Sequence, residues 1–220
     1  MSSTILFRLS GLSLLLGTLL AIIDLFIHPE SGGLAYYADP ATTLSHLVGF
    51  VSVLLTLLGL PGLYAYQAKQ AGILGLVSTV LVFFSVAMLD GTHAVIDSAI
   101  TPALATIPEA APLLAEGGPL EEAMQSGVQG TRGSVWGPVF LLSLILLGVT
   151  TIRAGVLPRW AGALPIVAAL TVPLGFVVPS LEGVAFAMPY VALGCLGSIL
   201  TMSEGTSATT HAVKPAPRVQ

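Results

Sequence analysis

The stretch QAGILGLVSTVLVFFSVAML, residues 70–89, carries no charged side chain and is bounded by Lys69 and Asp90. A helix needs about 20 mainly apolar residues to cross a hydrocarbon core of about 30 Å. The stretch therefore predicts a membrane-spanning helix. The number of residues between successive charges is used in the same way to locate the other spans of the chain.

The composition of the 220-residue chain agrees with this prediction. Hydrophobic residues make up 55% of the chain, charged residues make up 8%, and the mean hydropathy is +0.94. Soluble domains carry about 25% charged residues, so this chain has too little polar surface to coat a water-soluble particle. The composition excludes a soluble enzyme and a disordered chain. A single cysteine, Cys195, excludes a disulfide scaffold. Lys and Arg total 7 against 11 Asp and Glu, which leaves no basic surface for nucleic acid.

The spacing of charges predicts an all-α, polytopic integral membrane protein. Its single domain, residues 1–203, is expected to be a bundle of six transmembrane helices. The predicted spans are residues 6–28, 44–66, 71–99, 134–153, 160–180 and 184–202. Residues 101–132 form the one long outer loop, in which a short helix is predicted to begin at Pro119. The Ser-, Thr-, Ala- and Pro-rich residues 204–220 are expected to be a disordered cytoplasmic tail.

Basic residues lie almost entirely on one side of the predicted bundle. Cytoplasmic loops of membrane proteins carry an excess of Lys and Arg. If the N-terminus is cytoplasmic, only Arg132 of the 7 basic residues falls outside. The residues that fall inside are Arg8, Lys69, Arg153, Arg159, Lys214 and Arg218. We therefore expect a multi-pass protein of the cell membrane with both termini in the cytoplasm.

Small residues recur inside the predicted spans. They let helix backbones approach closely, because packing rather than hydrophobicity drives helix association in lipid. The pairs are Gly72/Gly75, Gly133/Gly137, Ala161/Gly162 and Gly194/Gly197, of which only Gly133/Gly137 is a strict GxxxG motif. Besides the lipid bilayer itself, these faces suggest a homo-oligomer or a membrane partner.

Ionisable residues gather near the outer ends of the first three spans. Such residues are costly within a membrane and mark a functional site by default. They are Asp24, His28, His46, Asp90, His93 and Asp97. In span three, Asp90, His93 and Asp97 stand at i, i+3 and i+7, within about 60° of one helix face at 100° per residue. We expect all six side chains to converge on one outward-facing pocket.

Three histidines with nearby carboxylates predict a site for Zn²⁺ or another divalent metal. The predicted ligands are His28, His46, His93, Asp90 and Asp97, with Asp24 as a buried carboxylate and Arg132 as a counter-charge. A catalytic zinc keeps three protein ligands plus water, and such a water attacks an ester or amide. This logic is similar to that of intramembrane hydrolases that use His and Asp from several helices. The sequence nevertheless contains no HExxH, GxSxG or HxxxH motif.

The same residues allow other interpretations. Two facing histidines can ligate haem, and a chain of Asp and His can relay protons or bind a cation. A purely structural role also fits, since Asp24 and His28 at i, i+4 can hold two spans together. The sequence alone favours a packing, accessory or small transport component without a dedicated catalytic centre. A membrane-embedded metal-dependent hydrolase is the competing hypothesis, and the cofactor stays open.

Two connections on the predicted cytoplasmic side resemble those of uncharacterised small multi-pass membrane proteins of bacteria. The first comprises residues 57–69 with 72–76, and the second comprises residues 153–162. The resemblance supports the predicted topology and implies no activity.

Reporter fusions test the topology. Fusions after positions 38, 68, 115, 156, 182 and 210 are expected to report outside, inside, outside, inside, outside and inside. The physical reason is the asymmetry of Lys and Arg across the predicted spans. Paired reporters, one active only outside the cytoplasm and one active only inside it, measure each site twice. An N-terminus outside the cytoplasm, or an odd number of spans, would contradict this topology and place the polar cluster on the other face.

Overall fold

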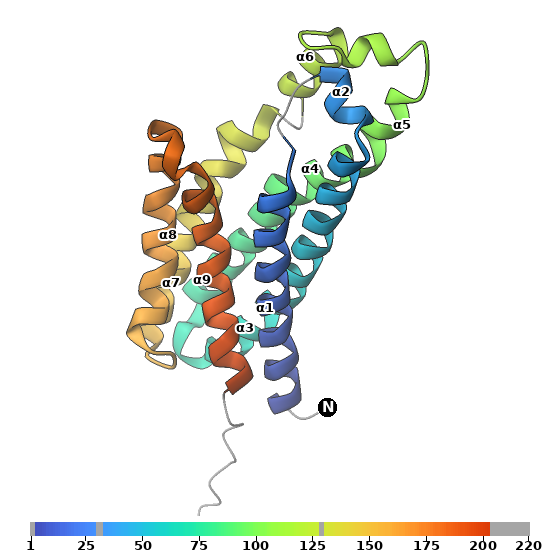
Figure 1. Cartoon of the computed structure of the whole chain (residues 1–220). Helices are drawn as coiled ribbons and strands as arrows, with labels where there is room; N and C mark the ends of the chain where they lie inside the picture. Colours follow the sequence, from blue (N-terminus) through green and yellow to red (C-terminus); the bar gives the residue numbers. More distant parts are fainter. Residues whose placement is uncertain (1–2, 30–32, 128–129, 203–220) are drawn as a thin grey trace, which may run out of the picture.

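The computed structural model describes residues 3–29, 33–127 and 130–202, and every regular element in these ranges is a helix (Figure 1). The predicted all-α class is confirmed. Five helical stretches are long and apolar enough to cross a membrane: Thr4–Ile27, Pro40–Ala105, Arg132–Ala154, Arg159–Val177 and Pro179–Met202. The tail predicted at 204–220 lies outside the described residues.

The second stretch begins with α3 (Pro40–Val86), which is divided into two arms by a sharp kink. The kink is at Gly72, whose φ of 56° and ψ of −150° are not helical. Glycine adopts a positive φ without steric cost, which explains why a glycine occupies this position. In Figure 1 the chain runs through α3 from one end of the molecule to the other and then returns toward α5 (Thr101–Ala105). The predicted spans 44–66 and 71–99 fall on these two arms.

The returning arm contains two π-helical turns. After α3 the chain forms η1 (Ala87–Gly91), α4 (Thr92–Val95), η2 (Ile96–Ile100) and then α5. A third π turn, η4 (Arg132–Trp136), precedes α7 (Gly137–Ala154). Such turns pair residue i with i+5 and are frequent at functional sites. They rotate the following side chains away from the positions that a regular α-helix would give.

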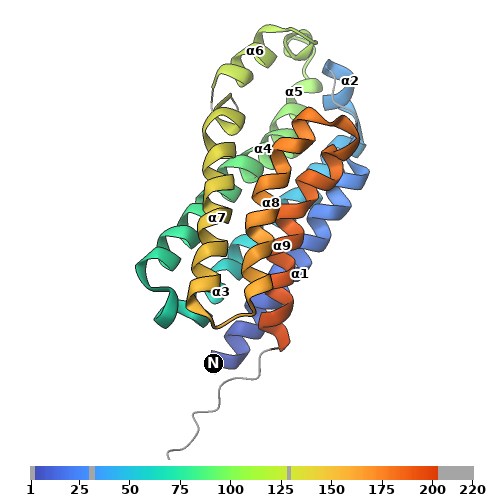
Figure 2. The same ribbon diagram turned by 90° about the vertical axis from the view of Figure 1, so that its left-hand side faces the viewer.

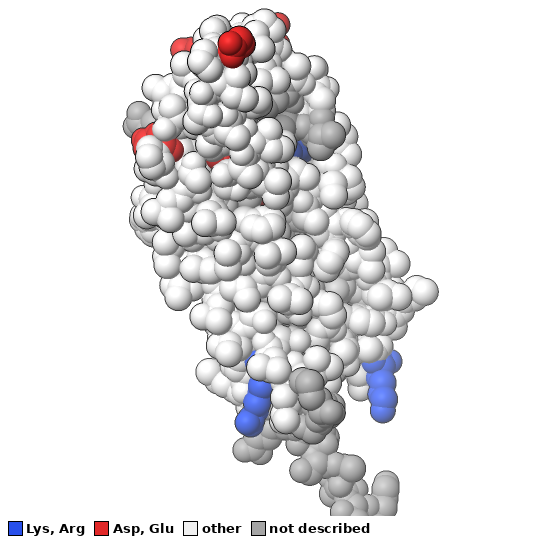
Figure 3. Space-filling model, turned by 90° about the vertical axis from the view of Figure 1, so that its right-hand side faces the viewer, with Lys and Arg blue, Asp and Glu red and all other residues white. Residues whose placement is uncertain are grey.

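Short helices occupy the connections at one end of the molecule. They are α2 (Gly33–Ala38), η3 (Ala111–Leu114) and α6 (Pro119–Ser126). α6 begins at the predicted proline, which suits the first helical position because proline lacks an N–H. Figure 3 shows acidic side chains at this end, basic side chains at the opposite end and a broad uncharged band between them. The charge asymmetry read from the sequence is therefore visible on this face.

The long helices form a closed ring (Figures 1 and 2). α1 (Ser3–Ile27) packs on α3, α3 on α7, α7 on α8 (Arg159–Val177), α8 on α9, and α9 on α1. A short helix, η5 (Pro179–Leu181), joins α8 to α9 (Glu182–Met202). Fully or almost fully buried leucines from this ring, including Leu14, Leu60, Leu63, Leu144, Leu147 and Leu193, form the apolar core.

Small residues bring α1 and α9 into close contact, in agreement with the sequence. A Cβ atom on Gly197 would lie 2.7 Å from the carbonyl oxygen of Gly11, which leaves no room for a side chain. The strict GxxxG motif behaves differently. A Cβ atom on Gly133 would meet nothing within 4 Å, and one on Gly137 would meet only the carbonyl of Arg132 at 3.5 Å. Within the chain, this motif lines a cavity and does not pack helices.

The contact between α1 and α9 makes Gly197→Ala destabilising. Overpacking against a backbone oxygen that cannot move aside is expected to cost about 1–3 kcal/mol. Gly183→Ala, also on α9, is the matched control, because a Cβ atom there meets nothing within 4 Å. Thermal unfolding in a neutral detergent should show a lower midpoint for Gly197→Ala only. Equal midpoints for the two variants would contradict the close packing of these helices.

Candidate metal centre

Three histidines from separate elements converge. His28 directly follows α1, His46 lies on the first arm of α3, and His93 lies on α4. One ligand nitrogen from each ring lies within 4.8 Å of the others. The two Nε2 atoms of His46 and His93 are 3.3 Å apart. His46 is 2% exposed, whereas His28 is exposed and His93 is partly buried.

Backbone carbonyls fix the orientation of two of these rings. Nδ1 of His46 lies 2.7 Å from the carbonyl oxygen of Thr42, and Nδ1 of His28 lies 2.9 Å from that of Pro29. A carbonyl oxygen can only accept a hydrogen bond, so each Nδ1 carries the proton. Nε2 of each neutral ring then presents a lone pair. Histidines that ligate metals are held through the other ring nitrogen in this way.

A buried carboxylate faces the third ring. Asp97 is 6% exposed, and its Oδ2 lies 3.1 Å from Nδ1 of His93, although the two atoms do not form an aligned hydrogen bond. The same Oδ2 lies 3.6 Å from Nε2 of His46. Thr101 donates a hydrogen bond of 3.4 Å to Oδ1 of Asp97. Carboxylates behind histidine ligands orient the ring and raise its basicity, and Asp97 is placed for this role.

The spacing of the ring nitrogens fits a tetrahedral ion. With Zn–N bonds of about 2.0–2.1 Å, two ligands of a tetrahedral site lie about 3.3–3.4 Å apart. The observed 3.3 Å between Nε2 of His46 and Nε2 of His93 matches this separation. The largest separation within the group is 4.8 Å, which exceeds 3.4 Å by about 1.4 Å. His28 is the exposed member of the group, so its side chain has the most room to adjust toward a bound ion.

Tyr36 on α2 packs over the histidines. Its hydroxyl lies 3.4 Å from Nε2 of His46, and the residue is only 8% exposed. Its ring packs edge-on against Tyr37, with centroids 5.2 Å apart. Burial raises the pKa of the Tyr36 hydroxyl, so this group stays protonated near neutral pH and offers a hydrogen-bond donor beside the cluster.

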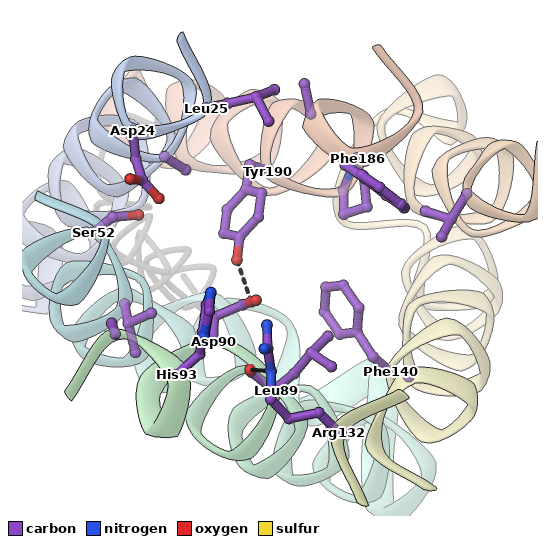
Figure 4. Close-up of a pocket in the computed structure, with 18 of the residues that line it drawn as sticks. Asp24, Leu25, Ser52, Leu89, Asp90, His93, Arg132, Phe140, Phe186 and Tyr190 are labelled. Atoms are coloured by element: carbon purple, nitrogen blue, oxygen red, sulfur yellow. Dashed lines mark hydrogen bonds between the residues drawn. The ribbon is translucent and has the colours of Figure 1, made fainter. Parts of the chain in front are cut away.

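A cavity of about 770 Å³ adjoins the cluster (Figure 4). All three histidines line it. Its other polar lining residues include Asp24, Ser52, Asp90, Arg132 and Tyr190, and its apolar lining includes Leu25, Leu89, Phe140, Phe176 and Phe186. Figure 4 shows Asp24, Asp90 and His93 on one side of the cavity and Phe140 and Phe186 on the other. The polar wall comes mainly from α1, α3, η1 and α4, and the aromatic wall comes from α7, α8 and α9.

Asp90 lies in the cavity but apart from the three-histidine group. It accepts a hydrogen bond from the hydroxyl of Tyr190 on α9 (Figure 4). Regular helical spacing predicts Asp90 on the same face as His93 and Asp97. The π turns on either side of α4 change that spacing: His93 and Asp97 stay in contact, and Asp90 turns toward α9.

Asp24 and Arg132 also line the cavity, whereas Asp97, which was expected to converge on the same pocket, is not among its lining residues. Asp24 fits closely against α3, because a Cβ atom on Gly49 would lie 2.8 Å from its Oδ2. Its Oδ1 is buried and has no hydrogen-bond partner among the described residues. Arg132 donates from Nε to the carbonyl oxygen of Leu89 at 2.6 Å. In the described part of the chain no carboxylate lies within ion-pair distance of Arg132, so no contact supports its predicted role as a counter-charge.

Sequence reasoning missed two tyrosines of this site. Tyr190 is the only tyrosine within the predicted span 184–202, and an aromatic hydroxyl away from the ends of an apolar span is a signal that could have indicated it. Tyr36 offered no comparable signal. It resembles an ordinary aromatic residue of the membrane interface, and its contact with His46 depends on the fold of the connection between α1 and α3.

Comparisons with models of known protein families, with curated proteins and with solved structures find no match for this chain. Inference about function therefore starts from the geometry of the site.

The convergent histidines predict zinc binding. Protein purified with zinc and freed of excess ions should carry about one Zn²⁺ per chain by elemental analysis. His46→Ala and His93→Ala should lose it, because each removes one of three ligands. Glu109→Gln, which neutralises an exposed carboxylate in the loop, is the control and should retain the ion. Zinc at the same stoichiometry in all variants would contradict a site at these histidines.

The carboxylate behind His93 should tune the same site. Replacing Asp97 by Asn keeps the shape of the side chain and removes its charge. Loss of such an outer partner typically weakens metal affinity about 10–100-fold. Competition with a chromophoric chelator measures the change. An unaltered affinity in Asp97→Asn would show that this carboxylate does not support the metal.

Proposed function

We propose that the chain crosses the cell membrane six times, with both termini in the cytoplasm and the cavity near the outer face. Five apolar helical stretches support this topology, and the stretch Pro40–Ala105 reverses direction at Gly72 and so supplies two crossings. The separation of acidic and basic side chains in Figure 3 and the excess of Lys and Arg on one side support the proposed orientation.

We further propose that this protein is a membrane-embedded, zinc-dependent hydrolase of esters or amides. The observation that carries the proposal is the 3.3 Å separation of two ring nitrogens, with a third histidine within 4.8 Å beside a cavity. Structural zinc sites are closed by four protein ligands, whereas catalytic sites keep a position open. Three histidines facing a cavity fit the second class.

A purely structural or accessory role, which the sequence alone favours, explains these contacts less well. In a structural role, a buried histidine is expected to have donors and acceptors matched around it. Here Nδ1 of His93 has no aligned partner although Asp97 lies 3.1 Å away, and the Nε2 atoms of His46 and His93 share a single hydrogen-bond contact of 3.3 Å. A cation bound by both Nε2 atoms would place the proton of His93 on Nδ1, where the Asp97 carboxylate could accept it. The geometry therefore favours metal chemistry.

Haem fits the site poorly. Axial histidines bind iron from opposite faces of a porphyrin. The rings of His46 and His93 are 4.7 Å apart between centroids and nearly perpendicular, at 84°. Two collinear Fe–N bonds alone would hold the rings farther apart, and the third histidine and Asp97 occupy the flanks.

The proposed reaction needs residues that hold the zinc ion and residues that transfer a proton. His28, His46 and His93 would hold the ion, which polarises a carbonyl group and acidifies water. In such a reaction the oxygen of water would bond to the carbonyl carbon, the C–O or C–N bond would break, and one proton of the water would pass to the leaving oxygen or nitrogen. The Tyr36 hydroxyl beside His46 and the pair of Asp90 and Tyr190 are hydroxyl and carboxyl groups placed to donate or accept that proton.

The cavity lining indicates a lipid-like substrate. Phe140, Phe176 and Phe186 offer an apolar wall opposite the polar one. Binding sites for small molecules are typically apolar with a few placed polar groups. An acyl chain would lie against the aromatic wall, with its carbonyl group toward the histidines.

Hydrolysis of defined acyl compounds tests this function. Purified, zinc-loaded protein should release the fluorophore from a long-chain acyl ester or acyl amide, and a chelator should abolish the release until zinc is restored. His93→Ala should fall to the uncatalysed rate, because the site loses a ligand, while Glu109→Gln should match the wild type. Activity that persists in zinc-free protein would overturn the proposal. If no ester or amide in a panel of chain lengths is cleaved by protein that does bind zinc, the hydrolase proposal fails and the metal site stands.

A further inference from the structure

Arg132 is the only Lys or Arg residue among those that line the cavity. It stands at the start of the π turn η4, on the helix wall that also carries Phe140. Figure 4 shows its guanidinium group pointing into the cavity, near His93 and Asp90. A permanent positive charge therefore faces an otherwise largely apolar space.

The guanidinium is fixed at one edge and open at the other. Its Nε donates to the carbonyl oxygen of Leu89, which lies on the other π turn, η1. This bond crosses between two helices and sets the direction of the side chain. The structure gives no further hydrogen bond or ion pair to Arg132 from the described residues. The two terminal nitrogens are left for something in the cavity.

Neighbouring carboxylates are engaged elsewhere. Asp90 and Asp97 are near enough to Arg132 for their charges to interact with it, but neither forms an ion pair with it. Asp90 accepts the hydrogen bond of Tyr190, and Asp97 faces His93. Arg132 is half-buried, and a partly desolvated guanidinium without an ionic partner is costly. Its planar, paired donors match carboxylate and phosphate oxygens.

We propose that the cavity binds a single-chain amphiphile with an anionic head, a carboxylate or a phosphate. Arg132 would hold the head, and the chain would lie among Phe140, Phe176 and Phe186. Binding itself does not depend on hydrolysis. If the proposed function also holds, the cleaved bond lies close to the anionic head, because the guanidinium of Arg132 lies near His93 in the cavity (Figure 4). The substrates are then acyl chains joined by an ester or amide to a small acidic group.

Titration with defined amphiphiles tests this inference. The protein is held in a neutral maltoside detergent, loaded with zinc and titrated with dodecyl phosphate and with dodecanoate while its unfolding temperature is recorded. Both should stabilise the wild type. Arg132→Gln should bind each about tenfold or more weakly, since a hydrogen bond to a charged group contributes about 1.5–3 kcal/mol. Arg132→Lys, which keeps the charge but loses the paired geometry, should fall between them.

The titration includes two controls on the protein and two control ligands. Arg153→Gln, at the other end of α7 and exposed, should bind as the wild type does. Zinc content should be unchanged in every Arg132 variant, which shows that the fold and the histidine site survive. Dodecanol, which lacks the charge, and inorganic phosphate, which lacks the chain, should each fail to stabilise the protein at the same concentration.

Several results would overturn the inference. Equal binding by Arg132→Gln would show that the head does not reach this residue. Loss of binding in His46→Ala but not in Arg132→Gln would place the anion on the metal. Stabilisation by dodecanol alone would show an apolar pocket without charge selection, and stabilisation by inorganic phosphate alone would show a small-anion site. None of these outcomes decides the hydrolase proposal, which the hydrolysis of acyl compounds tests separately.

Discussion

The hydrogen bond from Nδ1 of His46 to the carbonyl oxygen of Thr42 is the constraint on which this site depends. An unpaired polar atom in a buried position costs about 1–3 kcal/mol, so a histidine that is 2% exposed needs partners for both nitrogens. The first bond lies within one turn of α3 and fixes the proton on Nδ1. Nε2 is then directed at the space between α1, α2 and α4, where His93 and the Tyr36 hydroxyl approach it.

Hydrogen bonds between helices fix the wall of the cavity beside the histidines. Ser52 on α3 donates to the carbonyl of Gly17 on α1, and Thr18 on α1 donates to the carbonyl of Tyr190 on α9. These bonds tie three helices together at the level of the cavity, in a bundle where hydrophobicity gives no preference for one helix contact over another. The Tyr190 hydroxyl can therefore reach across the ring to Asp90.

Charge spacing in the sequence was enough to predict the helical class and to single out Asp24, Asp90, Arg132 and three histidines, which line the cavity. These features follow from local rules, since a charge inside lipid is costly wherever it stands. These rules did not predict that Asp90 turns away from His93 and Asp97. The expected face assumes 100° per residue, and the π turns at Ala87–Gly91 and Ile96–Ile100 break that periodicity without a distinctive sequence mark. Partners that come from distant segments, such as Tyr36 and Tyr190, depend on the tertiary fold and were not predicted.

The two halves of the chain make unequal contributions to the cavity. The first half supplies the histidines and carboxylates through α1, α3 and the returning arm, and the second half supplies the aromatic wall and Arg132 (Figure 4). A cation site meant only to stabilise the bundle would gain from being closed on all sides, because water competes for its ligands. Here the histidines instead face a space whose opposite wall is apolar and carries one fixed positive charge. That combination orients a molecule with two chemically different ends, and it leaves the reactive groups beside the junction of those ends.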